Sequence, residues 1–189
     1  MPVDIQSIMH PDCDVSLRLV SDADFAVFFA IYGDPEVMRH IGRTLDESQA
    51  RSYLQQTLLV HQDKQPKYLT WVIENVSDGE AVGLVGAHWQ QPALRNEVDV
   101  GVMILAKWRR QKKAHQAKAL LINQLIRQPE IEQVVVRCWV DNLAAMEANA
   151  GLGLKKGQRY VDRKTGQLCQ QWHTQDPLSL VPKSGTFWC

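Results

Sequence analysis

The chain has 189 residues, of which 45% are hydrophobic and 22% charged, and its 21 Lys and Arg residues balance 21 Asp and Glu residues. This composition is typical of one globular domain, and zero net charge provides no global field that would attract nucleic acid or a membrane surface. The start of the chain does not resemble a signal peptide, no apolar run approaches the ~20 residues that span a bilayer, and the cysteines lack metal-ligand spacing. We therefore expect a cytoplasmic monomer or homodimer with no metal and no nucleic-acid or membrane partner.

The N-terminal part of the chain predicts an arm, a strand and a helix. Residues 1–14 are polar and contain two prolines, which favours an irregular arm. Residues 16–20 alternate between polar and apolar side chains as a strand does. Ser21 or Asp22 can cap a helix over residues 23–31. Its expected inward-facing aromatic residues are Phe25, Phe28 and Phe29.

Two more helices are predicted before the central strands. Pro35 suits the first turn of a short helix, where its missing N–H costs nothing. Thr44 and Glu47 have the spacing of a capping box, which predicts the start of an amphipathic helix that ends near His61. A packed or solvated side chain is the favoured interpretation of His61, over a ligand or a base.

The middle of the chain predicts a meander followed by a crossover. Residues 68–76, 81–89 and 97–104 read as three antiparallel strands joined by turns. A helix that ends near Arg127 follows, and then a strand over residues 133–140 that is rich in β-branched side chains. Because a helix connects the last two strands, they should be parallel.

The C-terminal part predicts a helix, a hairpin and a tail. A helix begins after Asn142 and ends in a glycine turn, and residues 155–161 and 167–174 form a hairpin. The tail, residues 175–189, ends in an apolar Phe187-Trp188-Cys189 segment that is expected to dock on some surface. The predicted organisation is an arm over residues 1–14, a single domain over residues 15–174, and this tail.

The most informative stretch is the basic turn between the strand at 97–104 and the helix that follows. Its residues are Lys107, Trp108, Arg109, Arg110, Gln111, Lys112 and Lys113. The first N–H groups of a helix have no intrahelical partner, and the helix dipole makes that end positive. A strand, a basic turn and a helix N-terminus together predict an anion site, most plausibly for phosphate.

This turn resembles the cofactor-binding motif of the GNAT superfamily of N-acetyltransferases, particularly the branch that acetylates ribosomal protein N-termini. The family pattern Arg/Gln-x-x-Gly-x-Gly/Ala aligns without gaps on Arg109 to Ala114. Lys112 stands at the middle glycine, and Arg110 occupies another position that is often glycine. Glycine permits positive φ and a close approach of the backbone to a phosphate. Lys112 either clashes with a pyrophosphate or contacts it from the side, and the sequence leaves both readings open.

Two further stretches carry the resemblance. Residues 34–41 resemble the acceptor-side helix of this branch, and Asn142 and Gly153 match positions around the last helix. Ala145 replaces a serine that, in relatives, is thought to protonate the departing thiolate. The resemblance implies the acyl-CoA N-acyltransferase fold: a mixed, mostly antiparallel twisted sheet of about seven strands, flanked by helices, with splayed central parallel strands.

The resemblance also implies a reaction, the transfer of an acetyl group from acetyl-CoA to an amine in a ternary complex. The implied pantetheine site is formed by the backbone N–H groups of Met103, Ile104 and Leu105. The implied pyrophosphate site is formed by the N–H groups and side chains of Arg109, Arg110, Gln111, Lys112, Lys113, Ala114 and His115. Asn142 is expected to bind the pantetheine arm or to order the neighbouring turn.

The proton-transfer groups are less defined by the sequence. Asp99 is the candidate general base, because its strand should line the cleft, although a salt-bridged strand carboxylate explains it equally well. Glu74 is a second choice for the base, and Tyr160 is a poorly aligned candidate for the acid.

Two functions remain open at this point. Lys112 and Ala145 favour a catalytically impaired acyl-CoA-binding or regulatory module, whereas the basic side chains of the turn favour an active enzyme, which is our prediction. RNA binding by the turn rests on local charge alone and is set aside. The acceptor can be a protein N-terminus, a small amine or an antibiotic. Motifs of hydrolases, metalloproteases and nucleotide-binding proteins are missing from the sequence.

Overall fold

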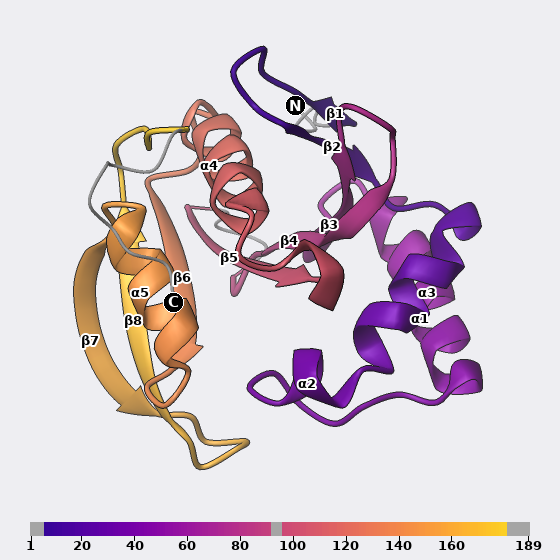
Figure 1. Ribbon diagram of the computed structural model, residues 1–189. Coiled ribbons are helices and arrows are strands. Elements are labelled where there is room, and N and C mark those ends of the chain that lie inside the picture. Colours follow the sequence, from indigo (N-terminus) through magenta and orange to yellow (C-terminus); the bar gives the residue numbers. More distant parts are fainter. Residues whose placement is uncertain (1–5, 92–95, 181–189) are drawn as a thin grey trace.

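The computed structural model describes residues 6–91 and 96–180, which form one twisted sheet flanked by helices (Figure 1). Within these residues the sheet has eight strands in the order β1-β2-β3-β4-β5-β6-β8-β7. The strands are β1 Ser7–Ile8, β2 Val15–Leu19, β3 Tyr68–Asn75, β4 Ala81–His88, β5 Glu97–Ile104, β6 Gln133–Trp139, β7 Lys155–Val161 and β8 Leu168–Thr174. Only β5 and β6 pair in parallel, so the expected mixed, mostly antiparallel sheet is confirmed.

The additional strand lies in the segment that the sequence suggested was an irregular arm. Ser7 and Ile8 pair with Arg18 and Leu17 of β2, and Ile8 is buried. The segment is too short to show an alternating pattern, which is why the sequence predicted about seven strands.

The helices that flank the sheet are α1 Phe25–Tyr32, α2 Pro35–Met38, α3 Glu47–His61, α4 Lys113–Ile126 and α5 Leu143–Gly151. A short 3-10 turn, Asp22–Asp24, precedes α1 and takes the place of its predicted first residues. Of the three aromatic residues expected to face inward, Phe28 is fully buried, whereas Phe25 and Phe29 are half-buried.

The predicted cap of α3 was wrong by two residues. Asp46, not Thr44, is the N-cap, and its Oδ1 accepts a hydrogen bond of 2.8 Å from the Gln49 N–H. Gln49 Oε1 accepts from the Asp46 N–H in return. Both registers fit the capping-box pattern, and Asp is a somewhat stronger N-cap than Thr.

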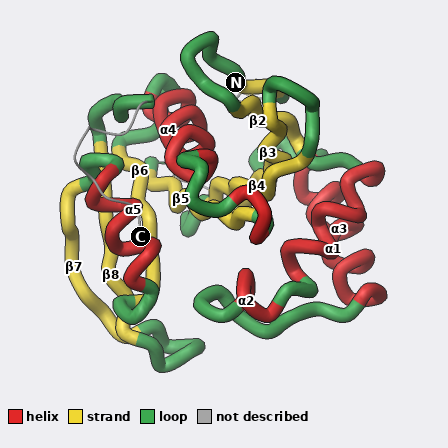
Figure 2. Tube along the Cα trace, in the orientation of Figure 1, coloured by secondary structure: helices red, strands yellow, loops and turns green. Residues whose placement is uncertain are grey.

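Two layers of helices cover opposite faces of the sheet (Figure 2). Because side chains alternate along a strand, Trp71 and Val85 pack with α4, whereas Val72 and Leu84 pack with α1 and α3. Residues in hydrogen-bonded register share a face, so the side chains of Asp99 and Met103 lie on the α1 side. Val98 and Val100 lie on the α4 side.

The sheet divides between its two central parallel strands. β5 and β6 are joined at three residue pairs only, the last of which is Asp99 with Val135. Beyond this pair the residues from Val100 to Ile104 have no partner in β6, whereas Val136 to Trp139 continue to pair with β8. The expected splaying of the central strands is therefore confirmed.

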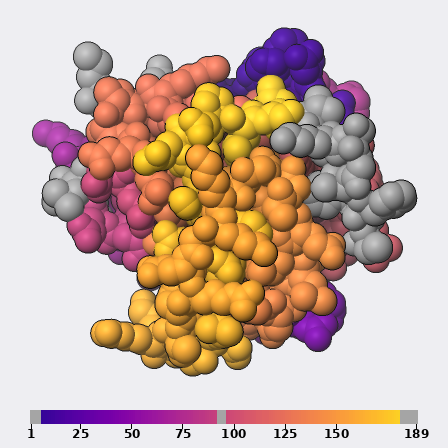
Figure 3. Space-filling model, turned by 90° about the vertical axis from the view of Figure 1, so that its left-hand side faces the viewer, coloured from indigo at the N-terminus to yellow at the C-terminus, as the bar shows by residue number. Residues whose placement is uncertain are grey.

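The C-terminal hairpin and the start of the tail complete the molecule. β7, β8 and α5 cover the side of the molecule seen in Figure 3. Leu178 donates to Asn123 Oδ1 and accepts from Asn123 Nδ2, at 2.6 and 2.9 Å, so the tail begins by docking on α4. Phe187-Trp188-Cys189 lies outside the described residues. In the described part of the chain, no helix has the length and apolar character needed to cross a membrane.

Candidate active site

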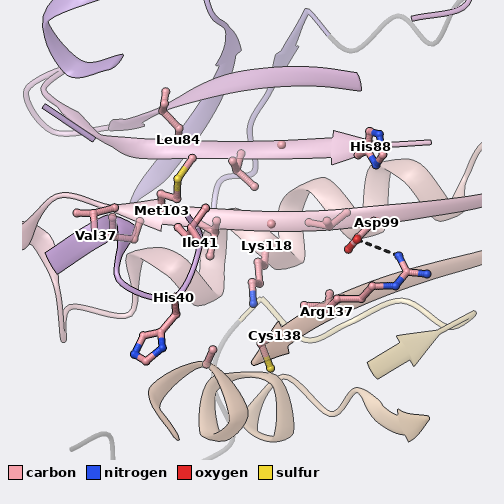
Figure 4. A pocket seen from close by; sticks show the side chains of 18 of the residues that line it. Val37, His40, Ile41, Leu84, His88, Asp99, Met103, Lys118, Arg137 and Cys138 are labelled. Atoms are coloured by element: carbon pink, nitrogen blue, oxygen red, sulfur yellow. Dashed lines mark hydrogen bonds and ion pairs between the residues drawn. The ribbon is translucent and has the colours of Figure 1, made fainter. Parts of the chain in front are cut away.

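A pocket of about 920 Å³ occupies the split between β5 and β6 (Figure 4). Its walls come from β3, β4, β5 and β6, and it is bordered by residues of the helices α1 to α5. The ionisable side chains that line it include Glu36, His40, His88, Asp99, Lys118 and Arg137. The pocket passes through the sheet, since Asp99 and Arg137 lie on the α1 face and Lys118 enters from α4 on the other face.

The basic turn leads from β5 into α4 and adopts a glycine-like backbone. Arg110 and Lys112 have φ values of 59° and 61°, the left-handed region that glycine occupies without strain. Lys112 is the N-cap of α4, and its carbonyl accepts the first intrahelical bond, from the Gln116 N–H. The turn thus adopts, at an arginine and a lysine, a backbone conformation that glycine favours. Arg109 lines the pocket.

Several side chains of the expected pyrophosphate site have other partners. Lys113 Nζ donates to Asn75 Oδ1 at 2.7 Å and to the Asp14 carbonyl at 3.3 Å. His115 Nε2 lies 3.1 Å from the carbonyl oxygen of Ser179 in the tail. The expectation that Lys113 and His115 contribute side chains is therefore corrected: at these two positions only backbone groups remain for an anion. Gln111 Nε2 donates to the Lys107 carbonyl, and Ala114 follows in the first turn of α4.

The backbone of β5 offers fewer donors to the split than expected. The Leu105 N–H donates to the Val82 carbonyl of β4 at 3.0 Å, so it cannot hold a pantetheine arm. In an antiparallel pair the N–H groups alternate in direction, so Met103 also points to β4, while Val102 and Ile104 point into the split. Of the predicted set Met103, Ile104 and Leu105, only Ile104 directs its N–H into the split, and the N–H of Val102 points the same way.

Asp99 lies at the deep end of the split, on the α1 face of the sheet. Its Oδ2 accepts a hydrogen bond of 2.9 Å from Arg137, whose other terminal nitrogen donates to Glu97 at 2.8 Å. Burial raises the pKa of Asp99 above its usual value, and the Arg137 charge opposes that rise. His88 is the residue opposite Asp99 on β4, and burial lowers its pKa, which keeps the imidazole neutral at pH 7.

Lys118 is a functional candidate that the sequence analysis missed. Its side chain is buried, and Nζ donates to Asn149 Oδ1 of α5 at 2.6 Å. Burial lowers the pKa of Lys118 to about 8. On the sequence Lys118 is one polar residue between the apolar positions of α4. Only the gap in the sheet below α4 reveals that it faces a pocket.

Other sequence candidates have structural roles or lie elsewhere. Asn142 Oδ1 accepts from the Ala145 N–H at 3.1 Å and caps α5, although Asn142 also lines the pocket. His61 Nε2 accepts from the Thr70 N–H at 3.1 Å, so the interpretation of His61 as a packed side chain is supported. Glu74 is bound by Arg18, and neither Glu74 nor Tyr160 lines the pocket.

A sheet split between parallel strands, with the split running towards a helix N-terminus, is the architecture of an acyltransferase that takes its acyl group from a CoA thioester. The chain belongs to the acetyltransferase (GNAT) domain family, whose model matches residues 14–155. The resemblance read from the sequence is thus confirmed. No curated protein matches the sequence.

Solved structures share the fold at low sequence identity. An acetyltransferase from Salmonella typhimurium that modifies the N-terminal serine of ribosomal protein L7/L12 is 14% identical, with a TM-score of 0.76 over 88% of this chain and 98% of that one. RimL in complex with coenzyme A, as a CoA–cysteine disulfide, is 14% identical, with a TM-score of 0.75 over 88% and 97%. Spermidine N-acetyltransferase from Vibrio cholerae, with CoA and spermine, is 10% identical, with a TM-score of 0.72 over 85% and 95%.

Proposed function

We propose that this protein transfers an acetyl group from acetyl-CoA to an amine by direct attack within a ternary complex. The observation that carries the proposal is the split between β5 and β6, which is open to both faces of the sheet. A thioester held in the split can be reached by an amine from the α1–α2 face while its CoA portion extends along the α4 face. Holding both reactants in this way supplies several kcal/mol of the barrier reduction.

On the cofactor side, the proposed contacts are mostly to the backbone. The N-terminal N–H groups of α4, with the Arg109 side chain, would bind the pyrophosphate. The N–H groups of Val102 and Ile104 would hold the pantetheine arm and polarise the thioester carbonyl. The backbone of Arg110 and Lys112 already has the required left-handed conformation, which supports cofactor binding despite the missing glycines.

On the acceptor side, the proposed base is Asp99. One of its carboxylate oxygens is bound by Arg137, and the other is left to accept a proton from the incoming ammonium, directly or through water. Neutral His88, opposite Asp99, is the second candidate, because a base must be unprotonated at working pH. The acceptor is a protein N-terminus or a small-molecule amine. A cytoplasmic location and a monomeric or homodimeric state also stay predictions.

The second candidate function is an acyl-CoA-binding module without turnover. Ala145 lines the pocket but has no hydroxyl group with which to protonate a thiolate, which is the specific observation in its favour. Cofactor binding is common to both functions, and acetylation of an amine distinguishes them.

The deciding experiment has two stages. Calorimetric titration of acetyl-CoA into the wild type and Lys112→Gly measures cofactor binding, for which we expect a micromolar Kd in the wild type. Release of the CoA thiol is then followed with peptides that begin with serine and with spermidine, chosen because related folds act on such amines. The matched controls are the same acceptors with their amines already acetylated.

The outcomes separate the two candidates. Thiol release that requires a free amine supports the transferase, and a loss of at least about 100-fold in kcat for Asp99→Asn with unchanged acetyl-CoA affinity supports the base. If His88→Gln shows that loss and Asp99→Asn does not, His88 is the base. Binding without release for every amine tested favours the module, and no binding to either protein contradicts both.

The position of the cofactor can be tested without any acceptor. Cys138 on β6 lines the pocket, whereas Cys13 and Cys169 are buried outside it. A relative has been captured as a CoA–cysteine disulfide. We expect CoA disulfide to modify Cys138 and not Cys13 or Cys169, as shown by peptide mass, and Cys138→Ser to abolish this modification.

A further inference from the structure

Lys118 is a buried cation without an anionic partner among the described residues. Lys118 is only 5% exposed, and its ammonium donates a hydrogen bond to the neutral amide oxygen of Asn149. An ammonium has three donor hydrogens, and a buried charge is normally paired because desolvation is costly. The titratable groups whose charges act on Lys118 are Asp99 of β5 and the Cys138 thiol of β6. No carboxylate in the described ranges forms an ion pair with it.

The position of Lys118 follows from the geometry of α4. Lys118 lies five residues after Lys113, so it is about 7.5 Å further along the helix axis from the N-terminus. Its side chain crosses the split from α4 to Asn149 on α5, as Figure 4 shows for the labelled Lys118 between β5 and β6. A pantetheine arm that enters from the α4 N-terminus and follows the edge of β5 must therefore pass the Lys118 ammonium.

The two faces of the split carry different kinds of groups. The carboxylate of Asp99 and the imidazole of His88 belong to the α1 face, and Lys118 belongs to the α4 face beside Cys138. In an acyl transfer the nucleophile attacks from one side of the carbonyl carbon, and the leaving group carries away its electron pair on another. A proton acceptor on the amine side and a cation on the thiol side match these two requirements.

We propose that the Lys118 ammonium receives the thiolate that leaves acetyl-CoA, first as an ion-pair partner and then as its proton donor. This inference rests on the proposed function. The amine nitrogen forms a bond to the thioester carbon, and the carbon–sulfur bond breaks with its electron pair on sulfur. Lys118 Nζ transfers one proton to that sulfur and regains one from solvent, while the proton lost by the amine goes to the base on the opposite face.

The other candidates for this role lack either the position or the acidity. Ala145 has no proton to donate, and Tyr160 does not line the pocket. The Cys138 thiol is close, but burial raises its pKa and makes it a poor acid. Lys118 is therefore placed to supply the proton that Ala145, which has no hydroxyl group, cannot donate.

The test uses CoA itself, so it needs no acceptor. CoA and desulfo-CoA, which lacks the sulfur, are titrated into the full-length protein at pH 7, and the ultraviolet absorbance of a thiolate is recorded against pH. A nearby ammonium lowers the pKa of a thiol from its usual value of about 8.5. We expect the thiol of bound CoA to have a pKa at least about one unit below that value. Desulfo-CoA should give no thiolate absorbance.

Three variants complete the design. Lys118→Met should bind CoA but lose the thiolate signal, and Lys118→Arg, which keeps the cation, should retain it. Gln116→Met is the matched control, because Gln116 is a buried polar residue of α4 that bonds to Asp14 and does not line the pocket. With any acceptor that is found, Lys118→Met should lower kcat by about 100-fold with little change in the KM for acetyl-CoA. The fall in wild-type activity at alkaline pH should be absent from Lys118→Arg.

The results distinguish failure of this inference from failure of the proposed function. If the wild type binds CoA and its thiol titrates normally, or if Lys118→Met keeps the thiolate signal, the role of Lys118 is refuted while the transferase proposal stands. If the wild type does not bind CoA, the proposed function fails and the inference falls with it. Should Lys118→Met not fold, the wild type and Lys118→Arg decide.

Discussion

Arg137 donates a hydrogen bond of 2.9 Å to Asp99 Oδ2 at the last residue pair that joins β5 to β6. The contact resembles the one between Arg18 and Asp24, which are joined by two hydrogen bonds of 2.9 Å. The pKa values of the two carboxyl groups are nevertheless shifted in opposite directions. The pKa of Asp24 is lowered, and the pKa of Asp99 is raised because burial at the pocket outweighs the charge of Arg137.

This difference predicts unequal losses of stability when the two charges are removed. Ionised Asp24 stabilises the fold above its unfolded pKa, so Asp24→Asn should lower the free energy of unfolding at pH 7 by about 2 kcal/mol, with a smaller loss as the pH falls. The charge of Asp99 opposes folding above its unfolded pKa, so Asp99→Asn should cost less than about 1 kcal/mol at pH 7. Urea unfolding at pH 7 and pH 4 measures both. Equal losses at pH 7 would show that Asp99 is a structural ion-pair residue.

The left-handed backbone of the basic turn predicts a stabilising substitution. A residue with a side chain at φ 61° is strained by about 1 kcal/mol, and glycine is not. Lys112→Gly should therefore unfold at a higher urea concentration than Lys112→Ala, which removes the ammonium but keeps the strain. The difference in unfolding free energy should be about 1 kcal/mol. Identical midpoints would mean that the turn relaxes to a negative φ in solution.

His61 makes the stability of the protein depend on pH. It accepts the Thr70 N–H as a neutral imidazole, and burial lowers its pKa to about 4. Between pH 6.5 and pH 4 the unfolded chain binds a proton at His61 that the folded chain does not, so stability falls as the pH falls through this window. After allowance for its partial exposure, we expect His61 to contribute on the order of 1 kcal/mol to the pH-dependent change in the free energy of unfolding.

The contribution of His61 to the pH dependence of stability is measured by comparing variants. His61→Gln should unfold with a flatter pH dependence between pH 7 and pH 4.5 than the wild type, since an amide can accept the same hydrogen bond without titrating. His10→Gln is the control, because His10 lies at the surface. An unchanged slope in His61→Gln would assign the acid sensitivity to other histidines whose pKa is lowered, such as His88 and His115.

Asn123 of α4 holds the start of the tail by two hydrogen bonds. Asn123 donates to and accepts from the backbone of Leu178, and Leu178 packs against the main core. Asn123→Ala should lower the free energy of unfolding by about 1–2 kcal/mol and increase amide hydrogen exchange in residues 176–180. Gln124→Ala, at the next position of the same helix, is the control and should change neither. Unchanged exchange in Asn123→Ala would mean that Leu178 packing alone holds the tail.

The antiparallel meander, the parallel direction of β5 and β6, and the C-terminal hairpin could be predicted because their signals are local. β-Branched runs, turn glycines and the helical crossover between β5 and β6 determine which strands pair and in which direction. The position of the basic turn before α4 could also be predicted, since Arg109 to Ala114 match a family motif that lies between a strand and a helix. The cap of α3 was misplaced because Thr44 and Asp46 both begin acceptable capping boxes.

The partners of the site residues could not be predicted in the same way. Lys113 reaches Asn75, which is 38 residues earlier in the sequence, and Lys118 reaches Asn149, which is 31 residues later. No periodicity encodes such pairs, because they depend on which elements the sheet brings under α4. Nor could the sequence show that the Leu105 N–H donates to β4. This direction follows from the pairing register of β4 and β5, and a shift of one residue would turn the N–H towards the split.

Three residue pairs between β5 and β6 hold together the two halves of the sheet, with five strands on one side and three on the other. Lengthening this short seam by further pairing would strengthen the sheet and, at the same time, close the route between β5 and β6. Selection for a more rigid fold and selection for an open route therefore act against each other at the same backbone atoms. Variants selected for thermal resistance with activity retained should therefore accumulate changes away from this seam, in α4, the outer strands and the tail.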